Sequence, residues 1–563
     1  MGARRQGVEF KTSAAHAGHS VTMWLYPAAF ILSAVSLAVS EVKLATVYWN
    51  AQEGDVTLRA GVLDRSQGDA YALYNDTLPQ TGWDVLEVRA GYGPHKRGDR
   101  ETLYMAGFLE GYITANRIYP HYRNLAPFFI TNSRIGQELN TFFNEQDDWV
   151  VGQIKANRGD PAWRHVDALH GQMQGLQRGV QKWALENNVK PLPKFAFHYL
   201  NGIGDIIDLV NKLSPQQARG FGAMTSGDIR RYTLRNGHCS AIIKVTPGFE
   251  NVLFGHSSWF TYSATSRIFK HWDFNLREVA AAAPKSSFSS YPGFLSSLDD
   301  YYLLSSGLVM LQTTIVNYNQ NLFDDITPQA LLSWQRVRTA NVLARDGKQW
   351  GEILAKHNSG TYNNQYMILN LNKIELGVGI HDGALYVVEQ MPTLVHSADQ
   401  TDILRNGYWA SYNIPFYRSI YELGGYQKLN DYMGNEYSHQ LSSRAKIFRR
   451  DQSKIRNVES LKAVLRYNGY KTDRYTSGNP CNTICCRDDL QPDTGSPVGC
   501  YDTKVADMRM AKKFMTSAVN GPTMEGKLPA FSWSTFDNVK HEGLPNTYKF
   551  PFVTMQPTLF TIP

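Results

Sequence analysis

Several familiar catalytic signatures are missing from this 563-residue sequence. It has no Gly-x-Ser-x-Gly nucleophile elbow, no His-Glu-x-x-His zinc motif and no Walker loop. The nearest approaches are GHSSW at 255–259, which lacks the final glycine, and the pair His541 and Glu542, where Pro545 would break the helix that a second zinc ligand needs. These absences argue against serine α/β-hydrolases, zincin proteases and P-loop NTPases. Nothing in the sequence requires a metal or an organic cofactor.

Long runs of basic residues and internal repeats are also missing. The 57 Lys and Arg against 50 Asp and Glu give a net charge of +7, spread thinly along the chain. This excludes a nucleic-acid-binding stripe and predicts at most weak contact with an anionic membrane surface. No repeat of fixed period is present, which excludes solenoids and propellers. With 43% apolar and 12% aromatic residues, the chain is expected to fold into a globular protein.

Only one long uncharged segment occurs before residue 41, at residues 24–39, and it follows a basic N-terminus. Its length and the small residues that end it predict a signal peptide cleaved after Ser40, so that residues 1–40 form a leader. A membrane-spanning helix is the alternative, but it needs about 20 apolar residues. We therefore expect no transmembrane anchor. Met23 is an alternative translation start, and Asn75 begins the only N-glycosylation sequon, Asn-Asp-Thr.

The pattern of apolar residues predicts a mixed α+β protein. Strands are expected at 42–49, 70–74 and 85–90, then at 240–245, 252–256, 365–370 and 384–390. Helices are expected at 101–118, around 264–272 and within 329–356, with an Ala- and Ser-rich linker at 280–290. Apolar residues also recur every three or four positions from Val166 to Trp183, and we interpret them as one helix face packed in the core.

The five cysteines divide into a cluster of four and one isolated residue, Cys239. In a secreted protein the cluster predicts two disulfides, and zinc is the alternative, although paired Cys-x-x-Cys knuckles are lacking. Joining the adjacent Cys485 and Cys486 would strain the bridge. Two pairings therefore stay open: Cys481 with Cys486 and Cys485 with Cys500, or Cys481 with Cys485 and Cys486 with Cys500.

Cys239 follows a turn signal, Asn236 and Gly237, at the start of an expected hairpin. If the two strands pair across the turn at 247–250, residues whose numbers add up to about 497 lie opposite each other. His256 and Trp259 would then flank Cys239, which is an arrangement suited to nucleophilic catalysis. The plain alternatives are a buried structural cysteine and a histidine that belongs to the core.

Many segments, in one order, resemble the phospholipase B-like proteins, and they cover nearly all of the chain after the leader. The segments are YMAGFLEGYIT (104–114), NGHCS (236–240), GHSSW (255–259), YSATSRIFKHW (262–272), NSGTYNNQY (358–366), VVEQMP (387–392), GYWASYNIPF (407–416), RAKIFRRDQ (444–452), NPCNTICCRDDL (479–490) and CYDTKVAD (500–507). The resemblance implies an N-terminal-nucleophile hydrolase with a four-layer αββα sandwich, made as a precursor. It also implies a glycoprotein of the lysosomal lumen or one that is secreted.

The resemblance further implies cleavage between His238 and Cys239 into fragments 41–238 and 239–563, which stay associated as one globular unit. Cys239 would be the nucleophile, and its neighbours in the site would be His256, Trp259, Asn413 and Arg444. Its freed α-amino group can accept the thiol proton, the cation at residue 444 can lower the thiol pKa, and the amide at residue 413 can donate to an oxyanion. His256 would orient the substrate or the amine, and Trp259 would offer an apolar wall.

The implied reaction is the release of fatty acids from phospholipid esters through a Cys239 thioester. One alternative is an amidase that acts on N-acyl amides with the same nucleophile. Another is a lysosomal lipid-binding protein that cleaves itself and has no further activity. Residues 212–238, rich in turn formers and in arginine, are expected to form an exposed linker whose removal uncovers the site.

Overall fold

The computed structural model describes residues 41–213, 224–236, 238–492 and 494–559. Its larger sheet in this part of the chain has eleven strands in the order β15-β14-β11-β10-β9-β8-β7-β4-β3-β1-β2. The strands are β1 (Glu41–Asn50), β2 (Asp55–Ala60), β3 (Ala70–Asp76), β4 (Asp84–Ala90), β7 (Ile268–Phe274), β8 (Lys285–Ser290), β9 (Tyr302–Leu304), β10 (Leu308–Thr314), β11 (Asn364–Asn370), β14 (Leu385–Met391) and β15 (Leu394–Asp399). Neighbouring strands are antiparallel except β4 and β7, which are parallel. This parallel pair joins the strands before Cys239 to those after it.

The second sheet carries the isolated cysteine. Its order is β16-β5-β6-β18-β19-β20, and β17 also pairs with β6. These strands are β5 (His238–Val245), β6 (Val252–Thr261), β16 (Tyr408–Ser411), β17 (Val498–Cys500), β18 (Asp502–Asp507), β19 (Thr516–Asn520) and β20 (Val553–Met555). A separate small ribbon pairs β12 (Ile374–Glu375) with β13 (Gly379–Ile380).

The hairpin of β5 and β6 has the register expected from the sequence. Cys239 lies opposite Ser258, and Ala241 lies opposite His256, so the paired numbers add up to 497. The turn between the strands is a single 3-10 turn, Pro247–Phe249, in which Gly248 has a φ of 67°. Since glycine has no Cβ, it adopts this left-handed conformation without strain. Cys239 is thereby fixed at the end of the hairpin, far from the turn.

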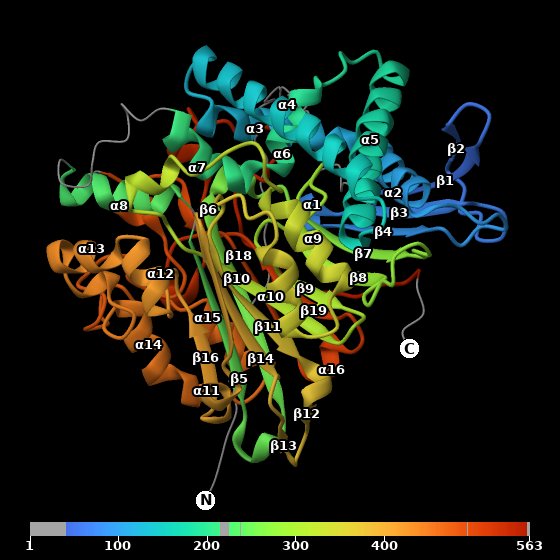
Figure 1. Cartoon of the computed structure of the whole chain (residues 1–563). Coiled ribbons are helices and arrows are strands. Elements are labelled where there is room, and N and C mark those ends of the chain that lie inside the picture. Colours follow the sequence, from blue (N-terminus) through green and yellow to red (C-terminus); the bar gives the residue numbers. More distant parts are fainter. Residues whose placement is uncertain (1–40, 214–223, 237, 493, 560–563) are drawn as a thin grey trace, which may run out of the picture. The chain divides into compact units, whose positions relative to one another are not determined.

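The two sheets pack face to face. Alternate residues of β10 separate onto two faces: Val309 and Leu311 contact side chains of β5 and β6, whereas Leu308 and Met310 contact the helices. This alternation follows from the two-residue period of a strand. Helix α2 (Asp99–Ile113) covers β1, β3 and β4, and α5 (Pro161–Glu186) packs against α2 (Figure 1). Helix α15 (Val458–Leu465) covers β6 and β18.

Close glycine contacts let α2 and α5 pack at short range. A Cβ at Gly175 would lie 1.9 Å from the carbonyl oxygen of Tyr104. The apolar face expected between Val166 and Trp183 lies on α5, and its members are buried or partly buried against this core. The remaining helices are α1 (Leu78–Thr81), α3 (Ala115–Phe129), α4 (Ser133–Ala156), α6 (Lys194–Asn201), α7 (Ile203–Leu213), α8 (Ser226–Arg235), α9 (Ser333–Leu343), α10 (Gly347–Ala355), α11 (Thr401–Arg405), α12 (Arg418–Leu423), α13 (Tyr426–Met433), α14 (Ser443–Asp451) and α16 (Met508–Ala511).

The sequence-based assignments are confirmed in most places, and the α+β class is correct. Strands form at or close to all seven expected positions, and helices fill most of 101–118 and 329–356. The helix expected at 101–118 ends early, because Thr114 leaves the helical conformation and α3 begins after it. Residues 1–40, and with them the signal-peptide prediction, lie outside the described residues. Among the residues that are described, no helix combines the length and the hydrophobicity needed to cross a membrane.

Two assignments were wrong. The helix expected around 264–272 is strand β7, and the linker expected at 280–290 contains strand β8. Both strands lie in the middle of the larger sheet, where β7 is buried throughout. Their polar side chains find partners there: Lys270 contacts Glu110, and the ring of His271 contacts the hydroxyl of Ser287. Because tertiary contacts satisfy these groups, the usual polar and apolar alternation of a strand is lost.

Candidate active site

Cys239 is the only one of the five cysteines without a disulfide partner, and it is buried with 4% of its surface exposed. Two side-chain hydrogen bonds hold its backbone. Its N–H donates to Oδ1 of Asn413 at 3.2 Å, and its carbonyl oxygen accepts from Nη1 of Arg444 at 2.7 Å. The main chain on both sides of the cysteine Cα is therefore fixed by side chains from elsewhere in the fold. A backbone clamped in this way presents its side chain in one orientation.

Asn413 links the pieces of this clamp. It follows β16 with a φ of 70°, a conformation that asparagine tolerates better than most residues. Its Oδ1 also accepts from Arg444 at 2.7 Å, and its Nδ2 donates to the carbonyl of Thr314 at 2.8 Å. The guanidinium of Arg444 lies 4.6 Å from the ring centre of Trp259. Burial lowers the pKa of Arg444 to about 10, so it stays charged at neutral and acidic pH.

Cys239 lines a small cavity of about 30 Å³. Ile203, Gly204 and Ile207 of α7 line one side of it, and Tyr362 lines another. A Cβ at position 204 would lie 2.6 Å from the ring of Tyr362, so only glycine lets α7 come this close. Burial raises the pKa of Cys239 to about 12, although a backbone N–H of Trp259 and the charge of Lys504 oppose this shift. In the uncut chain the thiol is therefore protonated.

A buried ionic network lies beside the thiol, on the same face of the hairpin. Nζ of Lys504 contacts Oδ2 of Asp299 at 2.6 Å, Oδ1 of Asp502 at 2.8 Å and Oγ of Ser258 at 2.6 Å. Arg267 adds ion pairs to both carboxylates, at 2.9 and 3.0 Å. Two cations thus balance two anions, which is the condition under which buried charges are tolerated. The pKa of Asp299 is held far below its usual range by these cations, against the effect of burial.

His256 belongs to this network. Its Nδ1 lies 3.1 Å from Nζ of Lys504, its partner in the register of β6 and β18. Because an ammonium group can only donate, Nδ1 must accept, and the ring proton is on Nε2. Burial, together with the charge of Lys504, lowers the pKa of His256 well below its usual value. His256 is therefore a neutral ring and not a strong base.

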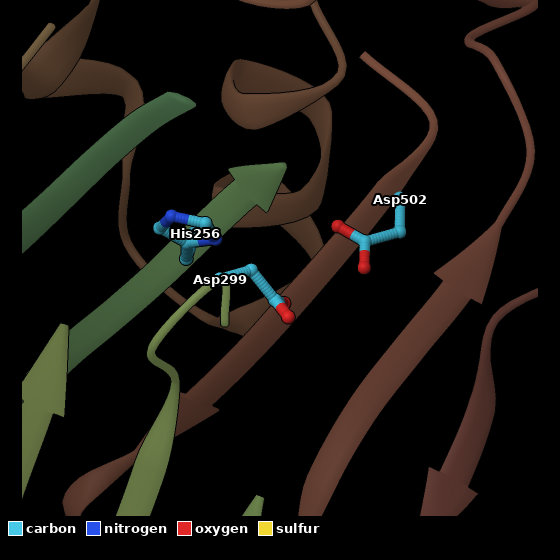
Figure 2. A group of neighbouring side chains, drawn as sticks. All are labelled: His256, Asp299 and Asp502. Carbon is cyan, nitrogen blue, oxygen red and sulfur yellow. The ribbon is translucent and has the colours of Figure 1, made fainter. Parts of the chain in front are cut away.

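His256, Asp299 and Asp502, labelled in Figure 2, bring potential metal-ligating atoms within 4.8 Å of one another. The ammonium of Lys504, however, forms a short contact with each of the three residues. It supplies the positive charge that a metal would supply, and a second cation there would be repelled. These residues therefore do not fit a metal site.

A second and much larger cavity, of about 670 Å³, lies on the other side of Trp259. Its walls include Trp259, Asn413 and Arg444, together with Arg230 and Leu234 of α8. Most of its wall is apolar, and polar and charged side chains supply the rest. Cavities of this size and character are typical of binding sites for amphipathic molecules. Because α8 belongs to the segment just before Cys239, part of this wall comes from residues upstream of the expected cleavage point.

The segment 212–238 differs from the exposed linker expected from the sequence. Residues 226–235 form α8, which begins with a capping box at Thr225 and Asp228. Ile229 is fully buried in the core, and the hydroxyl of Thr233 contacts that of Tyr318 at 3.0 Å. Part of the expected linker is therefore packed against the site. Residues 214–223 and Gly237 lie outside the described residues.

The cysteine cluster supports Trp259 from behind. The disulfides join Cys481 with Cys486 and Cys485 with Cys500, which is the first of the two pairings left open by the sequence. Cys500 of β17 lies opposite Trp259 of β6 in the sheet, and the indole packs on the buried cysteines. These four residues are thus structural, and zinc is excluded as their ligand.

The structure brings all five expected site residues into one region. Cys239, Asn413 and Arg444 touch directly, Trp259 stacks on the arginine, and His256 reaches the region through the ionic network. Asp451, seven residues after Arg444 in the same helix, pairs with Arg450 and Lys454 and not with Arg444. Sequence reasoning missed Asp299, Lys504, Asp502 and Arg267. The one signal in the sequence was the pair Asp502 and Lys504, two opposite charges within a segment that otherwise reads as a buried strand.

The sequon residue Asn75 lies in β3, opposite Val42 and Val85, and it is partly exposed. Asn75 therefore lies near the end of a strand, whereas glycosylated asparagines usually lie in surface loops. The hydroxyl of Thr77 donates to the carbonyl of Trp83 at 2.6 Å. Glycosylation of this site stays a prediction.

These observations define a mixed α+β protein with one free cysteine, whose backbone is held by two side-chain hydrogen bonds and which lies between a small cavity and a large one. The family model described as Phospholipase B matches residues 70–555. The chain is 49% identical to Phospholipase B-like 1 of Bos taurus over 95% of this chain and 97% of that protein. It is 48% identical to Phospholipase B of Crotalus adamanteus, over 95% and 97%. It is 35% identical to Phospholipase B-like protein A of Dictyostelium discoideum, over 87% and 88%.

The chain therefore belongs to the phospholipase B family, and it is a phospholipase B-like hydrolase.

Proposed function

We propose that the chain cleaves itself before Cys239 and then uses this residue as an N-terminal nucleophile to release fatty acids from phospholipid esters. The observation that carries the proposal is the clamp on the cysteine backbone. Asn413 accepts a hydrogen bond from the N–H that would become the α-amino group, and Arg444 holds the adjacent carbonyl. These contacts are of little use to an internal structural cysteine. They are well placed to hold a new N-terminus beside its own thiol.

In the self-cleavage step the thiol sulfur attacks the carbonyl carbon of His238, and the peptide bond to the nitrogen of Cys239 breaks. The nitrogen takes a proton, and a thioester joins residue 238 to the sulfur. Water then hydrolyses the thioester, leaving a carboxylate on residue 238 and a free thiol. In the uncut chain the thiol pKa of about 12 makes this step slow until a group nearby accepts the proton.

In the hydrolytic cycle the α-amino group of Cys239 accepts the thiol proton, and the sulfur attacks the carbonyl carbon of the lipid ester. The amine returns the proton to the leaving alcohol, and water releases the fatty acid from the thioester. Asn413 would hold the amine through its oxygen, while one of the two N–H groups of its Nδ2 donates to Thr314 and the other stays available for the oxyanion role expected from the sequence. The large cavity beside Trp259 offers room for an amphipathic substrate.

The fold supports the same class. Two sheets pack face to face with helices on their outer faces, as in the αββα sandwich of N-terminal-nucleophile hydrolases. Fragments 41–238 and 239–563 would stay associated, because β4 pairs with β7 along seven residues and α7 lines the thiol cavity. The leader and the disulfides favour the lysosomal lumen or secretion. An amidase acting on N-acyl amides, and a lipid-binding protein without further activity, are the alternatives.

The test compares fatty-acid release from phosphatidylcholine vesicles and from an N-acylethanolamine by the purified two-chain protein. We expect release from the phospholipid, and none from a matched Cys239→Ala protein. Release from the amide alone would replace the ester substrate by an amide. Binding of both lipids without release from either would favour the non-enzymatic alternative.

A further inference from the structure

A third cavity, of about 20 Å³, lies in the described part of the chain between α5, α9 and strands β7 to β9. Its lining includes His165, Trp272, Arg338 and Asn341. A cavity needs about 10–15 Å³ to hold one water-sized particle, so this one has room for a single small species. It lies outside the site of Cys239, and its lining shares no residue with either of the cavities described above.

Arg338 brings a positive charge to this cavity that no carboxylate neutralises directly. Its guanidinium donates to the carbonyl of Leu295 and to Oε1 of Gln172, and it lies 4.6 Å from the ring centre of Trp272. No ion pair to Arg338 forms among the residues that the structure describes. The nearby carboxylate of Glu110 is already paired with Lys270 at 2.7 Å and does not line the cavity. A buried charge without a counter-ion is costly.

Several N–H groups near Arg338 have no hydrogen-bond partner among the described residues. Oδ1 of Asn341 accepts from Nε1 of Trp350 at 2.8 Å, which can only donate, so the amide nitrogen of Asn341 faces elsewhere. This nitrogen has no partner within the described residues, and neither does Nε1 of Trp272. The same holds for Nε2 of Gln172, whose oxygen is taken by Arg338.

His165 adds a fourth group of this kind. The ring is fully buried on α5, and neither nitrogen has a partner within the described residues. One nitrogen of a neutral imidazole is always a donor. Burial and the charge of Arg338 lower the pKa of His165 to about 3, so the ring is neutral at the pH of any cellular compartment. It therefore offers an N–H without adding a second charge.

We propose that this cavity is a binding site for one small monovalent anion, with chloride as the natural occupant. The groups around the cavity favour a negative charge, because they comprise one guanidinium and several buried N–H donors with few acceptors to match them. A water molecule could accept from two donors and give one proton to the unprotonated nitrogen of His165, but it would leave the remaining donors unpaired and the charge of Arg338 unbalanced. A halide accepts from all directions and balances the charge. Phosphate and carboxylates are too large for a cavity of this volume.

Anion binding would stabilise the loop that follows β8. Arg338 holds the carbonyl of Leu295, and the same loop carries Asp299 to the ionic network beside Cys239. An anion that fixes Arg338 would therefore stabilise this loop as well. The expected effect is mainly on stability, because no residue of the cavity contacts the cysteine.

The test uses the processed protein in chloride and in gluconate at equal ionic strength. Bound chloride should raise the midpoint of thermal unfolding, with saturation, by about 2 °C. Crystals grown in bromide should give one anomalous peak within hydrogen-bond distance of Arg338. A chloride-independent midpoint together with no bromide peak would overturn the proposal.

Asn341→Asp is the decisive variant. Its carboxylate keeps the oxygen that accepts from Trp350 and places a second oxygen where the amide nitrogen lies, so that it replaces the anion. We expect this variant to lose the chloride effect and to match, without chloride, the stability of the wild type with chloride. The control is Arg345→Gln, an exposed residue just beyond the same helix, which should keep the full chloride effect. An Asn341→Asp protein that still responds to chloride like the wild type would contradict the site.

Discussion

The cavities on the two sides of Trp259 differ in size, in polarity and in the origin of their walls. The inner one, about 30 Å³, encloses the thiol of Cys239 between α7, Tyr362 and a balanced ionic network. The outer one, about 670 Å³, is lined by Arg444, by Trp259 and by α8. The nucleophile lies in the small cavity, whereas an amphipathic substrate fits only the large one. This difference fits the proposal that the uncut chain is a precursor, in which the cysteine and the substrate cavity are already formed and cleavage before Cys239 would connect them.

The largest effect is expected from removing the thiol of Cys239, the proposed nucleophile. Cys239→Ala should abolish both the cut before residue 239 and lipid hydrolysis, a loss of at least about 10³-fold, since no other nucleophile replaces it. Cys239→Ser should still cut slowly, because a hydroxyl attacks the same carbonyl less readily. The measurement is the fraction of cut chain on a denaturing gel beside the rate of fatty-acid release. A fully active alanine variant would refute the nucleophile.

The next test removes the ammonium group of Lys504 from the ionic network beside the inner cavity. Lys504→Met leaves Asp299 and Asp502 with only Arg267 as a counter-ion, and breaking a buried ion pair costs about 3–5 kcal/mol. We expect a lower free energy of unfolding and slower self-cleavage. Denaturant unfolding and the rate of cutting measure the two effects.

Lys512→Met, at an exposed position, is the matched control. The double variant Asp299→Asn with Lys504→Met removes both members of one pair, and it should recover part of the stability that the single change loses. A single variant with wild-type stability and wild-type processing would show that the network is dispensable.

A smaller effect is expected from the support behind Trp259. The disulfide of Cys485 and Cys500 spans 15 residues, and a loop of this length is worth about 3 kcal/mol in the chain-entropy model. Changing both cysteines to serine should lower the free energy of unfolding by about this amount, and it should reduce hydrolysis by loosening Trp259. The four cysteines should also resist alkylation until a reductant is added. Rapid alkylation without a reductant would contradict the disulfides in the mature protein.

A pH-dependent effect concerns Asp208, whose carboxylate accepts a hydrogen bond from the backbone N–H of Tyr362 at 2.8 Å in the wall of the inner cavity. Burial raises the pKa of Asp208 to about 8. The folded state therefore binds this proton more tightly than the unfolded state, so its contribution is complete below about pH 4 and is lost as the pH rises towards 8. Asp208→Asn should remove this dependence, a change of about 1.4 kcal/mol for each pH unit within that window.

Thermal or denaturant unfolding at pH 5, 6 and 7 measures the prediction for Asp208. At each higher pH, the free energy of unfolding of the variant should increase relative to that of the wild type. A constant difference between the two proteins across this range would show that Asp208 is already ionised in the folded state.

How far the sequence predicts this molecule depends on the range of the interactions. The hairpin register follows from local turn chemistry and was predicted residue by residue. The clamp residues Asn413 and Arg444 came from the family resemblance, since they lie about 170 and 200 residues from Cys239 and no spacing rule connects them. The ionic network was missed because its members lie on four separate segments, and each charge alone looks like a surface residue. Strand β7 was mistaken for a helix for a similar reason, because distant partners satisfy its buried polar groups.

The most direct test of the central claim is the N-terminus of the mature large fragment, determined by mass spectrometry after proteolytic digestion. The account predicts a fragment that begins at Cys239 and ends at Pro563, and an intact peptide spanning residues 235–243 in the Cys239→Ala protein. Hydrolytically active protein in which the peptide 235–243 remains intact as the main species would contradict it.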